Sequence, residues 1–551
     1  MICKTFIRNY AKPSTTKIGG MKKIVDKKNP TALFQFGNFS KLVVPSKKQI
    51  ESSKDKAVLD FDALRIFPSV RIAMKEEIKD SYILKNTYLK SKDELDIKPT
   101  PVQSLAIKKI NQVRKPKKIS ESKEIFNDLL DNQNKRLKVF TIAAETGSGK
   151  TWSYLSCVLS KLKEDDLKIF NKSKREYVNS RSLSKVRSVI LLPTNELVDQ
   201  VYSTLSKANN IPLNLPENLD PKFIKDKNFS EFLYEEAAHD KLGFNILKWG
   251  AGEPASKFFN FLNKGTVDIL VTTPTKLQSL GKQHSQEENP YRFLYNVDYC
   301  VVDEADTLFD PSWFKDTTAI IEKFSKCKDV ILVSATIPKN FQKSIGNYFK
   351  DTIDVVTSSL HKVPSQINVK IIDSMQNPYN GSKIRALAQA LYAIQSDNTE
   401  PGQVKRVIVF VNNKKDVHPL ISTLCTKFQQ NLDNFVGLSG DDTPLDRADK
   451  IQPFIQPPEP LEFDKEKNEY LGQRMKVLVT TDLFARGVNF QSVKNVIIMD
   501  FPNNSVDLVH RIGRTGRMKQ SGRVFIITDK KSSKSWIKAL PNATKRGVRI
   551  G

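Results

Sequence analysis

The sequence predicts an α/β protein with two parallel-sheet domains in tandem and basic extensions at both ends. Short apolar runs that do not alternate with polar residues recur in two groups, as expected for strands buried on both faces. Longer helix-like segments separate these runs, and strand–helix alternation favours parallel sheets. A stretch rich in Pro, Asn and Gly at 364–381 divides the two groups and is expected to link the domains.

Length and composition set the first limits. The chain has 551 residues, of which 39% are hydrophobic and 27% charged, and its formal charge is +27. This length fits two to four domains of roughly 150 residues. The composition excludes a collagen, a coiled coil and a wholly disordered chain. No apolar run approaches the ~20 residues of a membrane-spanning helix. The five cysteines show no C-x-x-C spacing, so a reducing compartment fits best.

The predicted elements follow in chain order. We expect helices at Trp152–Lys161 and Lys383–Ile394, and surface insertions at Leu162–Arg187, Asn209–Asn228 and Gln452–Lys467. The expected domain limits are 1–60 for a presequence with a basic extension, 61–360 for the first domain, 361–530 for the second and 531–551 for a basic tail. The expected strands are Val139–Ala144, Val189–Leu192, Asp268–Thr273, Tyr299–Val302, Val330–Val333, Val407–Val411, Val477–Thr480, Val496–Met499 and Val524–Ile527.

The extensions are more basic than the rest of the chain. Residues 1–60 hold 13 basic and 4 acidic side chains, and residues 529–551 hold 7 and 1. Such charge favours a polyanionic partner, either nucleic acid or an anionic membrane surface, although a solvated surface that aids solubility is the alternative. The first 25 residues lack acids and can form an amphipathic helix up to Pro13, which predicts a mitochondrial transit peptide, cut after Tyr10, and a location in the matrix. A disordered basic start is the other interpretation.

A phosphate-binding loop is indicated by Ala144-Glu145-Thr146-Gly147-Ser148-Gly149-Lys150-Thr151, which follows a predicted strand and opens a predicted helix. Glycines let backbone N–H groups converge on phosphate oxygens, and the helix N-terminus adds its positive dipole end. Ala144 stands where the strict pattern has Gly, but the turn itself is intact. We expect Lys150 to reach the β and γ phosphates and Thr151 to bind Mg²⁺.

A second phosphate element is indicated by Asp303-Glu304-Ala305-Asp306, directly after a buried strand. An acid at the end of such a strand is costly unless a charged partner meets it, and Mg²⁺ beside a phosphate loop is such a partner. We expect Asp303 to hold the metal and Glu304 to polarise the attacking water. An acidic helix N-terminus is the alternative interpretation.

With four further motifs, these elements resemble the DEAD-box ATP-dependent RNA helicases over residues 97–528. The resemblance implies two RecA-like domains, ATP and Mg²⁺ as cofactors, RNA-stimulated ATP hydrolysis and a monomer. The four motifs are Pro99-Thr100-Pro101-Val102-Gln103, Ser334-Ala335-Thr336, Thr480-Thr481-Asp482-Leu483-Phe484-Ala485-Arg486-Gly487-Val488 and His510-Arg511-Ile512-Gly513-Arg514-Thr515-Gly516-Arg517.

The resemblance also implies roles for single residues. Gln103 would read the adenine edge, for which an amide has the right donor and acceptor. Ser334 and Thr336 would couple hydrolysis to unwinding, and His510 would bridge toward them. An Arg at every third position cannot be buried without anions to meet, and the phosphates of ATP would be those anions. Arg514 and Arg517 would therefore act as arginine fingers. Further nucleotide contacts are implied for Asp482, Gly487 and Asn489.

RNA contacts are expected at strand ends and helix starts, where N–H groups and hydroxyls grip a sugar–phosphate chain. Binding of that kind predicts little sequence specificity and strong salt dependence. The implied residues are Pro193, Thr194, Asn195, Gly252, Thr273, Pro274, Lys276 and Thr481.

The chain departs from the family pattern at several positions. Asn195 stands in place of Arg, and Thr275-Lys276 stands in place of Gly-Arg. Two guanidinium groups that would each bind a phosphate through two hydrogen bonds are therefore missing or weakened. Asn489 replaces the Asp expected at the ribose, and Pro444 replaces a Gln. Phe61 fits the local pattern of the adenine-stacking aromatic but lies too far upstream, and a place in the apolar core is an equal alternative.

In these departures and in its presequence, the chain resembles a narrower group, the fungal mitochondrial DEAD-box helicases of large ribosomal subunit assembly. The implied substrate is mitochondrial ribosomal RNA in an assembling particle. Two other functions stay open: a nucleotide-dependent RNA clamp with little unwinding activity, and a motor that acts on DNA.

Overall fold

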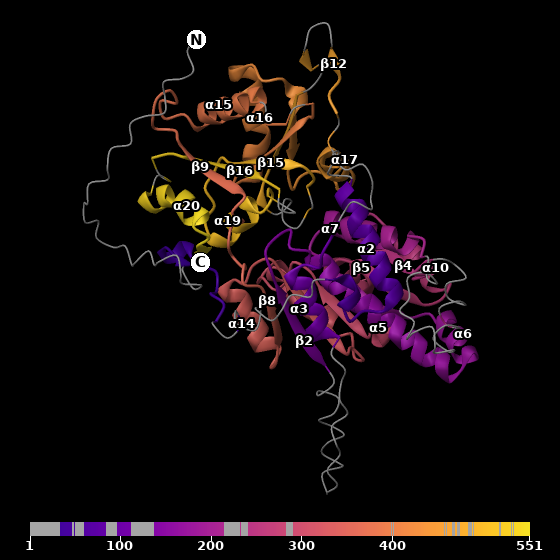
Figure 1. The fold of residues 1–551 in the computed structure, drawn as a ribbon. Coiled ribbons are helices and arrows are strands. Elements are labelled where there is room, and N and C mark those ends of the chain that lie inside the picture. Colours follow the sequence, from indigo (N-terminus) through magenta and orange to yellow (C-terminus); the bar gives the residue numbers. More distant parts are fainter. Residues whose placement is uncertain are drawn as a thin grey trace.

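The computed structural model consists of two lobes joined by one linker (Figure 1). In the described residues, no helix combines the length and apolarity that a membrane crossing requires. The proposed transit peptide lies outside the described residues. The structure describes residues 33–46, 49, 60–83, 96–111, 137–213, 232, 241–282, 290–397, 399–400, 402–456, 458, 460–464, 469–470, 474–482, 488, 490–516, 520–530, 532 and 534–551.

The first lobe is built on a seven-stranded sheet in which every neighbouring pair is parallel. Its central strands are buried at nearly every position, as expected of Val/Ile/Leu runs covered on both faces. In spatial order the strands are β4 (Ile246–Trp249), β5 (Val267–Thr272), β3 (Val186–Leu191), β6 (Tyr299–Val302), β7 (Asp329–Ser334), β2 (Lys138–Ala143) and β8 (Ile353–Val356).

Helices cover both faces of this sheet, and alternate residues of each strand enter two separate cores. Ile190 packs in one core, and Val189 and Leu191 pack in the other. One face carries α2 (Pro68–Ile83), α3 (Pro101–Ile110), α5 (Lys150–Lys172) and α7 (Asn195–Asn210). The other carries α10 (Ala255–Leu262), α11 (Pro274–Gln278), α12 (Ala305–Leu308), α13 (Phe314–Ile321) and α14 (Lys339–Tyr348). The remaining elements are η2 (Phe61–Ala63), α6 (Lys174–Ser182), η5 (Ser279–Lys282) and η6 (Arg292–Asn296).

The second lobe contains a six-stranded sheet, also parallel throughout. Its strands in spatial order are β11 (Phe435–Leu438), β14 (Met475–Thr480), β10 (Lys405–Phe410), β15 (Val493–Ile498), β16 (Gly522–Thr528) and β9 (Ile367–Asp373). One core lies against α15 (Lys383–Ser396) and α16 (Val417–Phe428), the other against α17 (Pro444–Ile455), α19 (Ser505–Ile512) and α20 (Ser535–Lys545). A small hairpin of β12 (Phe463–Asp464) and β13 (Glu469–Tyr470), with η7 (Lys414–Asp416) and η8 (Leu432–Asn434), completes the lobe.

The two ends of the described chain pair with each other. Strand β1 (Leu33–Phe34) runs parallel to β17 (Arg549–Ile550), and η1 (Gly37–Phe39) follows β1. Helix α20 packs on β9, and Leu540 of the helix lies in the same core as Ile367 and Val369 of the strand. The segment expected to be a basic tail is therefore a folded part of the second lobe.

All nine predicted strands are confirmed. Two other expectations were wrong. The stretch 364–381 is not a linker, because it contains β9, and the chain passes between the lobes at 357–366. The segment Leu162–Arg187 is not a surface insertion, because its first half continues α5 and buries Leu162 and Phe170.

Candidate functional site

The predicted site residues of the first lobe gather at one edge of its sheet. In a parallel sheet, all strands end at the same edge, and ligands bind there. The phosphate loop follows β2, the acids follow β6, and Ser334 ends β7. These three strands are neighbours in the order β6-β7-β2. The strand order thus brings residues that are far apart in sequence into one site.

Glycines shape the loop between β2 and α5. Gly147 and Gly149 have φ of 77° and 91°, in the left-handed region that glycine tolerates best. A Cβ on Gly149 would lie 2.7 Å from Nε2 of Gln103. The loop ends at the N-terminus of α5, where free N–H groups and the helix dipole favour an anion. The predicted phosphate contacts all lie in this loop or on the first turn of α5: Thr146, Gly147, Ser148, Gly149, Lys150 and Thr151.

Lys150 is a half-buried cation of the phosphate loop. Its Nζ donates to the carbonyl oxygens of Ala144 at 2.8 Å and Glu145 at 2.9 Å. Burial lowers the pKa of Lys150, whereas the negative charges of Glu304 and Asp303 act in the opposite direction. Neutral carbonyls compensate an ammonium less well than an anion does. This side chain is therefore suited to a phosphate group.

Asp303 directly follows β6 and is held by two donors. One carboxylate oxygen accepts the N–H of Glu304 at 2.8 Å, and the other accepts the hydroxyl of Tyr154 at 3.0 Å. Burial, and next the negative charge of Glu304, raise the pKa of Asp303 to about 7. Two adjacent carboxylates with so little compensating charge fit a divalent cation, which would favour the ionised form of Asp303. The residues present therefore suit Mg²⁺ beside a bound phosphate.

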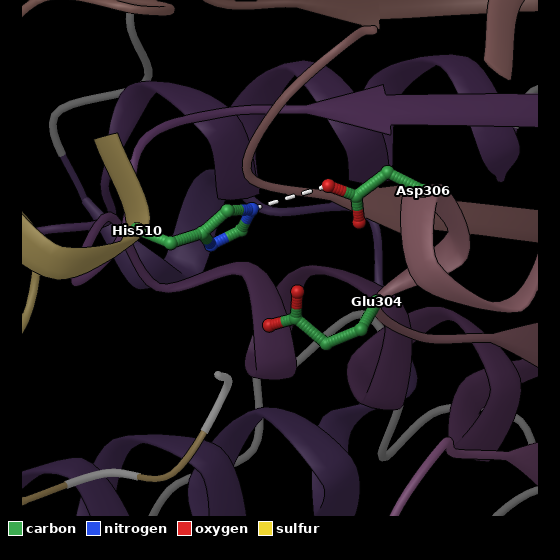
Figure 2. A group of neighbouring side chains, drawn as sticks. All are labelled: Glu304, Asp306 and His510. Atoms are coloured by element: carbon green, nitrogen blue, oxygen red, sulfur yellow. Dashed lines mark hydrogen bonds and ion pairs between the residues drawn. The ribbon is translucent and has the colours of Figure 1, made fainter. Parts of the chain in front are cut away.

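Glu304 has an unusual backbone and an unpaired oxygen. Its φ of 49° is left-handed, which is uncommon for a residue other than glycine, and it precedes α12. The side chain is 6% exposed, and Oε2 has no hydrogen-bond partner among the described residues. Backbone strain and an uncompensated buried oxygen are both costs that functional sites tolerate. Figure 2 shows this carboxylate facing His510 and Asp306.

The two lobes meet at His510, which lies on α19 of the second lobe. Its Nε2 is 3.2 Å from Oδ2 of Asp306 (Figure 2). The same atom is 3.4 Å from the Thr336 hydroxyl. The Thr336 hydroxyl also donates to Oδ2 of Asp306. Ser334 fixes this segment, because its hydroxyl donates to the Thr336 carbonyl and accepts the Thr336 N–H. The structure thus brings together Asp306, Ser334, Thr336 and His510, and Glu304 lies beside them.

A second contact between the lobes lies at the phosphate loop. The Thr146 hydroxyl donates to the Gly513 carbonyl at 3.2 Å. The next residue, Arg514, is 1% exposed and donates to the carbonyls of His510 and Val488. Its positive charge contributes to the lowered pKa of Lys150, so the two cations lie in the same region. Arg517 lies outside the described residues, as do Gly487 and Asn489.

Asp482 has a structural partner that the sequence did not reveal. Its two carboxylate oxygens accept two hydrogen bonds from the Arg511 guanidinium, both at 2.7 Å. Arg511 is 1% exposed and also donates to the carbonyl of Asp500 and the side chain of Asn412. In this structure Asp482 therefore orients Arg511, and no nucleotide contact of Asp482 is needed to explain its position.

Gln103 contacts the phosphate loop rather than projecting into solvent. It forms a reciprocal capping box with Thr100, in which the Thr100 N–H donates to Oε1 at 2.9 Å. Its Nε2 donates to the Gly149 carbonyl at 3.4 Å. The Gln103 amide therefore links the start of α3 to the phosphate loop.

Comparisons with known proteins agree with this geometry. Residues 100–344 match the family described as DEAD/DEAH box helicase, and residues 382–519 match the helicase conserved C-terminal domain. The chain is 52% identical to the "ATP-dependent RNA helicase MRH4, mitochondrial" of Debaryomyces hansenii, over 95% of this chain and 90% of that protein. It is 38% identical to the protein of the same name in Saccharomyces cerevisiae, over 96% and 90%. The chain belongs to the DEAD-box family of ATP-dependent RNA helicases.

Two solved structures confirm the fold of this helicase as two RecA-like domains. "Mss116p (NTE and C-tail double deletion) bound to ssRNA and AMP-PNP" matches with a TM-score of 0.58 and 21% identity, over 93% of this chain and 82% of that one. "S. cerevisiae Dbp5 bound to RNA and ADP BeF3" matches with a TM-score of 0.55 and 17% identity, over 89% and 94%. RNA-stimulated ATP hydrolysis is the activity of the family, and the curated relatives above carry mitochondrial names.

The candidate RNA positions of the helicase lie at the other half of the same sheet edge. They follow β3, β5 and β4, which are neighbours in the order β4-β5-β3. Thr481 lies at the corresponding edge of the second sheet, after β14. Across the lobes, Nε of Arg447 lies 3.3 Å from a carboxylate oxygen of Glu196. The positions brought together on the first lobe are Pro193, Thr194, Asn195, Gly252, Thr273, Pro274 and Lys276.

The two residues that replace family arginines bind the protein itself. Oδ1 of Asn195 accepts the N–H of Ala251 at 2.8 Å, in the turn after β4. Nζ of Lys276 donates to the Glu253 carbonyl at 2.6 Å and lies 4.8 Å from the Trp249 ring centroid. Both side chains therefore stabilise the turn at 250–253, and neither presents a bidentate fork to a phosphate.

Phe61 is 2% exposed and packs in the core of the first lobe, so its ring offers no free face to a base. The alternative interpretation, a core residue, is the correct one. Sequence reasoning also missed Tyr154 and Arg511. Arg511 carries a signal, because it begins the series of arginines at every third position, whereas nothing in the sequence marks Tyr154.

Proposed function

We propose that this helicase remodels RNA in the mitochondrial matrix and that its substrate is large-subunit ribosomal RNA within an assembling particle. The single observation that carries the enzymatic part is the contact of His510 with Asp306 and Thr336. The first lobe carries the phosphate loop and the second lobe carries the arginines. The contact of His510 brings the two lobes together, so that both groups can act on one nucleotide.

The proposed roles follow from the geometry of the described residues and, for Arg517, Gly487 and Asn489, from the resemblance to the family alone. Lys150 and the loop bind the phosphates, and Thr151 and Asp303 hold Mg²⁺, which supplies positive charge at the phosphates when bound. The unpaired Oε2 of Glu304 accepts a hydrogen bond from the attacking water and draws off its proton. Arg514 and Arg517 stabilise charge that develops in the transition state. Gln103 reads adenine, and Gly487 and Asn489 contact the nucleotide.

The proposed location and substrate rest on other support. The acid-free basic start of the chain is typical of a transit peptide, and curated relatives carry the word mitochondrial in their names. The proposal of ribosomal RNA comes from the resemblance to the fungal ribosome-assembly helicases. A large particle adds contacts that offset a weak intrinsic grip at Asn195 and Lys276. The helicase acts as a monomer in this proposal.

Crosslinking tests the substrate. RNA recovered from ultraviolet-crosslinked helicase in purified mitochondria should map mainly to large-subunit ribosomal RNA. Recovery of mainly messenger or intron RNA would contradict the proposal. ATP hydrolysis should rise with RNA and not with DNA of the same sequence, since 2′-hydroxyl contacts distinguish the two. Stimulation by DNA would favour the motor that acts on DNA.

A nucleotide-dependent RNA clamp with little unwinding activity is the second candidate. Asn195 and Lys276 bond to the backbone of the turn at 250–253, which favours this candidate. The surface expected to bind RNA then has fewer side chains that can pair with phosphates. A short RNA duplex separates the two functions. ATP-dependent release of one strand supports remodelling, whereas nucleotide-dependent retention of the duplex without release supports the clamp.

A further inference from the structure

Residues 33–46, called the strap below, connect the two lobes outside the covalent linker. The strap starts on the second lobe, where β1 pairs with β17 and the Gly551 N–H donates to the Phe34 carbonyl. Figure 1 shows this indigo segment next to α20, α19 and α14, beside the C-terminus. It is a part of the chain that no motif of the helicase explains.

An aromatic cluster anchors the strap to the second lobe. The ring of Phe36 stacks on Trp536 with centroids 4.8 Å apart, and Phe39 lies 4.8 Å from Trp536 and 5.6 Å from Phe501. Aromatic pairs of this kind add to the free energy of simple burial. Trp536 belongs to α20, so the anchor uses the C-terminal helix.

The strap then pairs with the first lobe immediately after Thr336. Val43 donates its N–H to the Ile337 carbonyl at 2.8 Å, and Lys339 donates its N–H to the Lys41 carbonyl at 2.8 Å. Leu42, which is 2% exposed, lies opposite Pro338 in this antiparallel bridge. The pairing therefore fixes the backbone that leads out of the Ser334–Thr336 segment.

One strap residue, Lys41, contacts both lobes. Lys41 accepts from Lys339 of the first lobe through its carbonyl, and its N–H donates to the Ser505 hydroxyl at 3.0 Å. Ser505 is the first residue of α19, the helix that carries His510. The strap thus joins the segment of Thr336 to the helix of His510.

The linker closes this ring of contacts. Nε2 of His361 accepts the Ile337 N–H at 3.0 Å, and the His361 carbonyl accepts the Ile550 N–H at 2.9 Å. Burial lowers the pKa of His361 to about 3, so the imidazole stays neutral and keeps its acceptor. Ile337 is therefore held by the strap on one side and by the linker on the other.

We propose that the strap is a positioning element of the ATPase site: it holds Ile337 and Ser505 next to each other and so favours the lobe arrangement in which His510 meets Asp306 and Thr336. The strap acts on the assembly of the site, so its role is the same whichever RNA is the substrate. Because a ligand binds the assembled arrangement, its apparent affinity scales with the fraction of molecules already in that arrangement.

The test uses the full chain and a generic single-stranded RNA. Phe39→Ala weakens the anchor, and Ser505→Ala removes the acceptor of the Lys41 N–H while the helix cap at Asn504 stays intact. Phe463→Ala is the matched control, because Phe463 packs on Tyr470 in the hairpin of the same lobe, away from the strap. Steady-state ATPase assays give KM for ATP, the RNA concentration for half-maximal stimulation and kcat.

The two strap variants should raise both half-saturation values about three- to tenfold and leave kcat within about twofold, since saturating ligands restore the assembled arrangement. Hydrogen exchange at the Val43 and Lys339 amides, which are the donors between the strap and the first lobe, should become faster in parallel. The control should change none of these. Unchanged half-saturation values with unchanged amide protection would overturn the proposal, as would a loss of kcat alone.

A second variant and a second measurement keep the test decisive. If Phe39→Ala does not fold, Ser505→Ala carries the test, because it leaves the aromatic cluster in place. If the unmodified chain itself shows no RNA-stimulated hydrolysis, the proposed function fails, and amide exchange at Val43 and Lys339 still reports whether the strap holds the lobes together.

Discussion

The Nε2 atom of His510 lies 3.2 Å from the carboxylate of Asp306, although 204 residues and the boundary between two lobes separate them. Both side chains are 2% exposed. Replacement by alanine removes the contact of α19 with Asp306 and Thr336. We expect His510→Ala to lower ATP hydrolysis roughly 10- to 100-fold with little change in nucleotide affinity. Nucleotide titration and steady-state assays measure the two quantities. His418→Ala, at an exposed histidine, is the control; an equal loss there would contradict the role of His510.

Glu304→Gln should separate binding from turnover. The amide keeps the size of the side chain but loses the basicity that a water-polarising group needs, so hydrolysis should fall about 10²- to 10⁴-fold. Nucleotide affinity should stay within a few-fold, and the protein should remain on RNA in the presence of ATP. Filter binding with labelled ATP and RNA measures retention. Turnover near that of the unmodified chain would remove Glu304 from its proposed role.

Tyr154→Phe tests the hydroxyl that donates to Asp303. Without this donor, the carboxylate is less well held and its ionised form less favoured, so the affinity for a divalent cation should fall about tenfold. Paramagnetic resonance of Mn²⁺ with the nucleotide complex measures this directly. Tyr348→Phe is the control, since that hydroxyl bonds to Glu322 and the Thr318 carbonyl, away from the site. Equal Mn²⁺ affinity in both variants would show that the Tyr154 hydroxyl is not needed.

Arg511→Ala should destabilise the second lobe. The substitution removes four hydrogen bonds and leaves Asp482 without its partner, at a cost of about 3 kcal/mol in the free energy of unfolding. Urea unfolding followed by amide exchange in β14 and β15 reports it. Lys414→Ala, which breaks an exposed pair with Asp441, should cost less than about 1 kcal/mol. Similar costs for the two variants would contradict the central position of Arg511.

His361 gives the junction of the lobes a pH dependence. Its pKa is about 3 in the folded protein and about 6.5 in an unfolded chain, so the unfolded state binds more protons between these values. Its contribution to stability is present above pH 6.5 and is lost as the pH falls toward 3. From pH 7.5 to 5.5 the unfolding free energy should drop by about 1.4 kcal/mol from this group.

His361→Asn measures that contribution, because Asn tolerates the left-handed φ of 62° and does not titrate. The variant should lose less stability than the unmodified chain over the same pH interval. An equal loss in both would mean that another group is responsible.

The predicted and observed folds differ in a consistent way. The nine strands identified from sequence lie inside the two large sheets or next to their edges. The four strands of these two sheets that were missed, β4, β8, β9 and β11, are their edge strands. Edge strands are covered less completely, and β4 and β9 alternate between buried and more exposed positions. A search for continuous apolar runs finds strands covered on both faces and passes over the others.

The site residues divide in the same way into those that the sequence reveals and those that it does not. Residues within a motif, such as Lys150, Asp303 and Thr336, have local neighbours that reveal them. Tyr154 and Ser505 gain their contacts only when separate elements pack together, so spacing along the chain gives no sign of them. Phe61 shows the converse, because a local pattern that fits a nucleotide contact is also that of a core residue, and burial decides between the two.

The order of strands in the first sheet has one more consequence. A single strand, β6, separates β3, which leads to Asn195, from β7, which leads to Thr336. Neighbouring strands lie about 4.8 Å apart. A polynucleotide and a triphosphate bound at this edge would be coupled through the single strand β6, so the coupling requires no long chain of side-chain contacts between them.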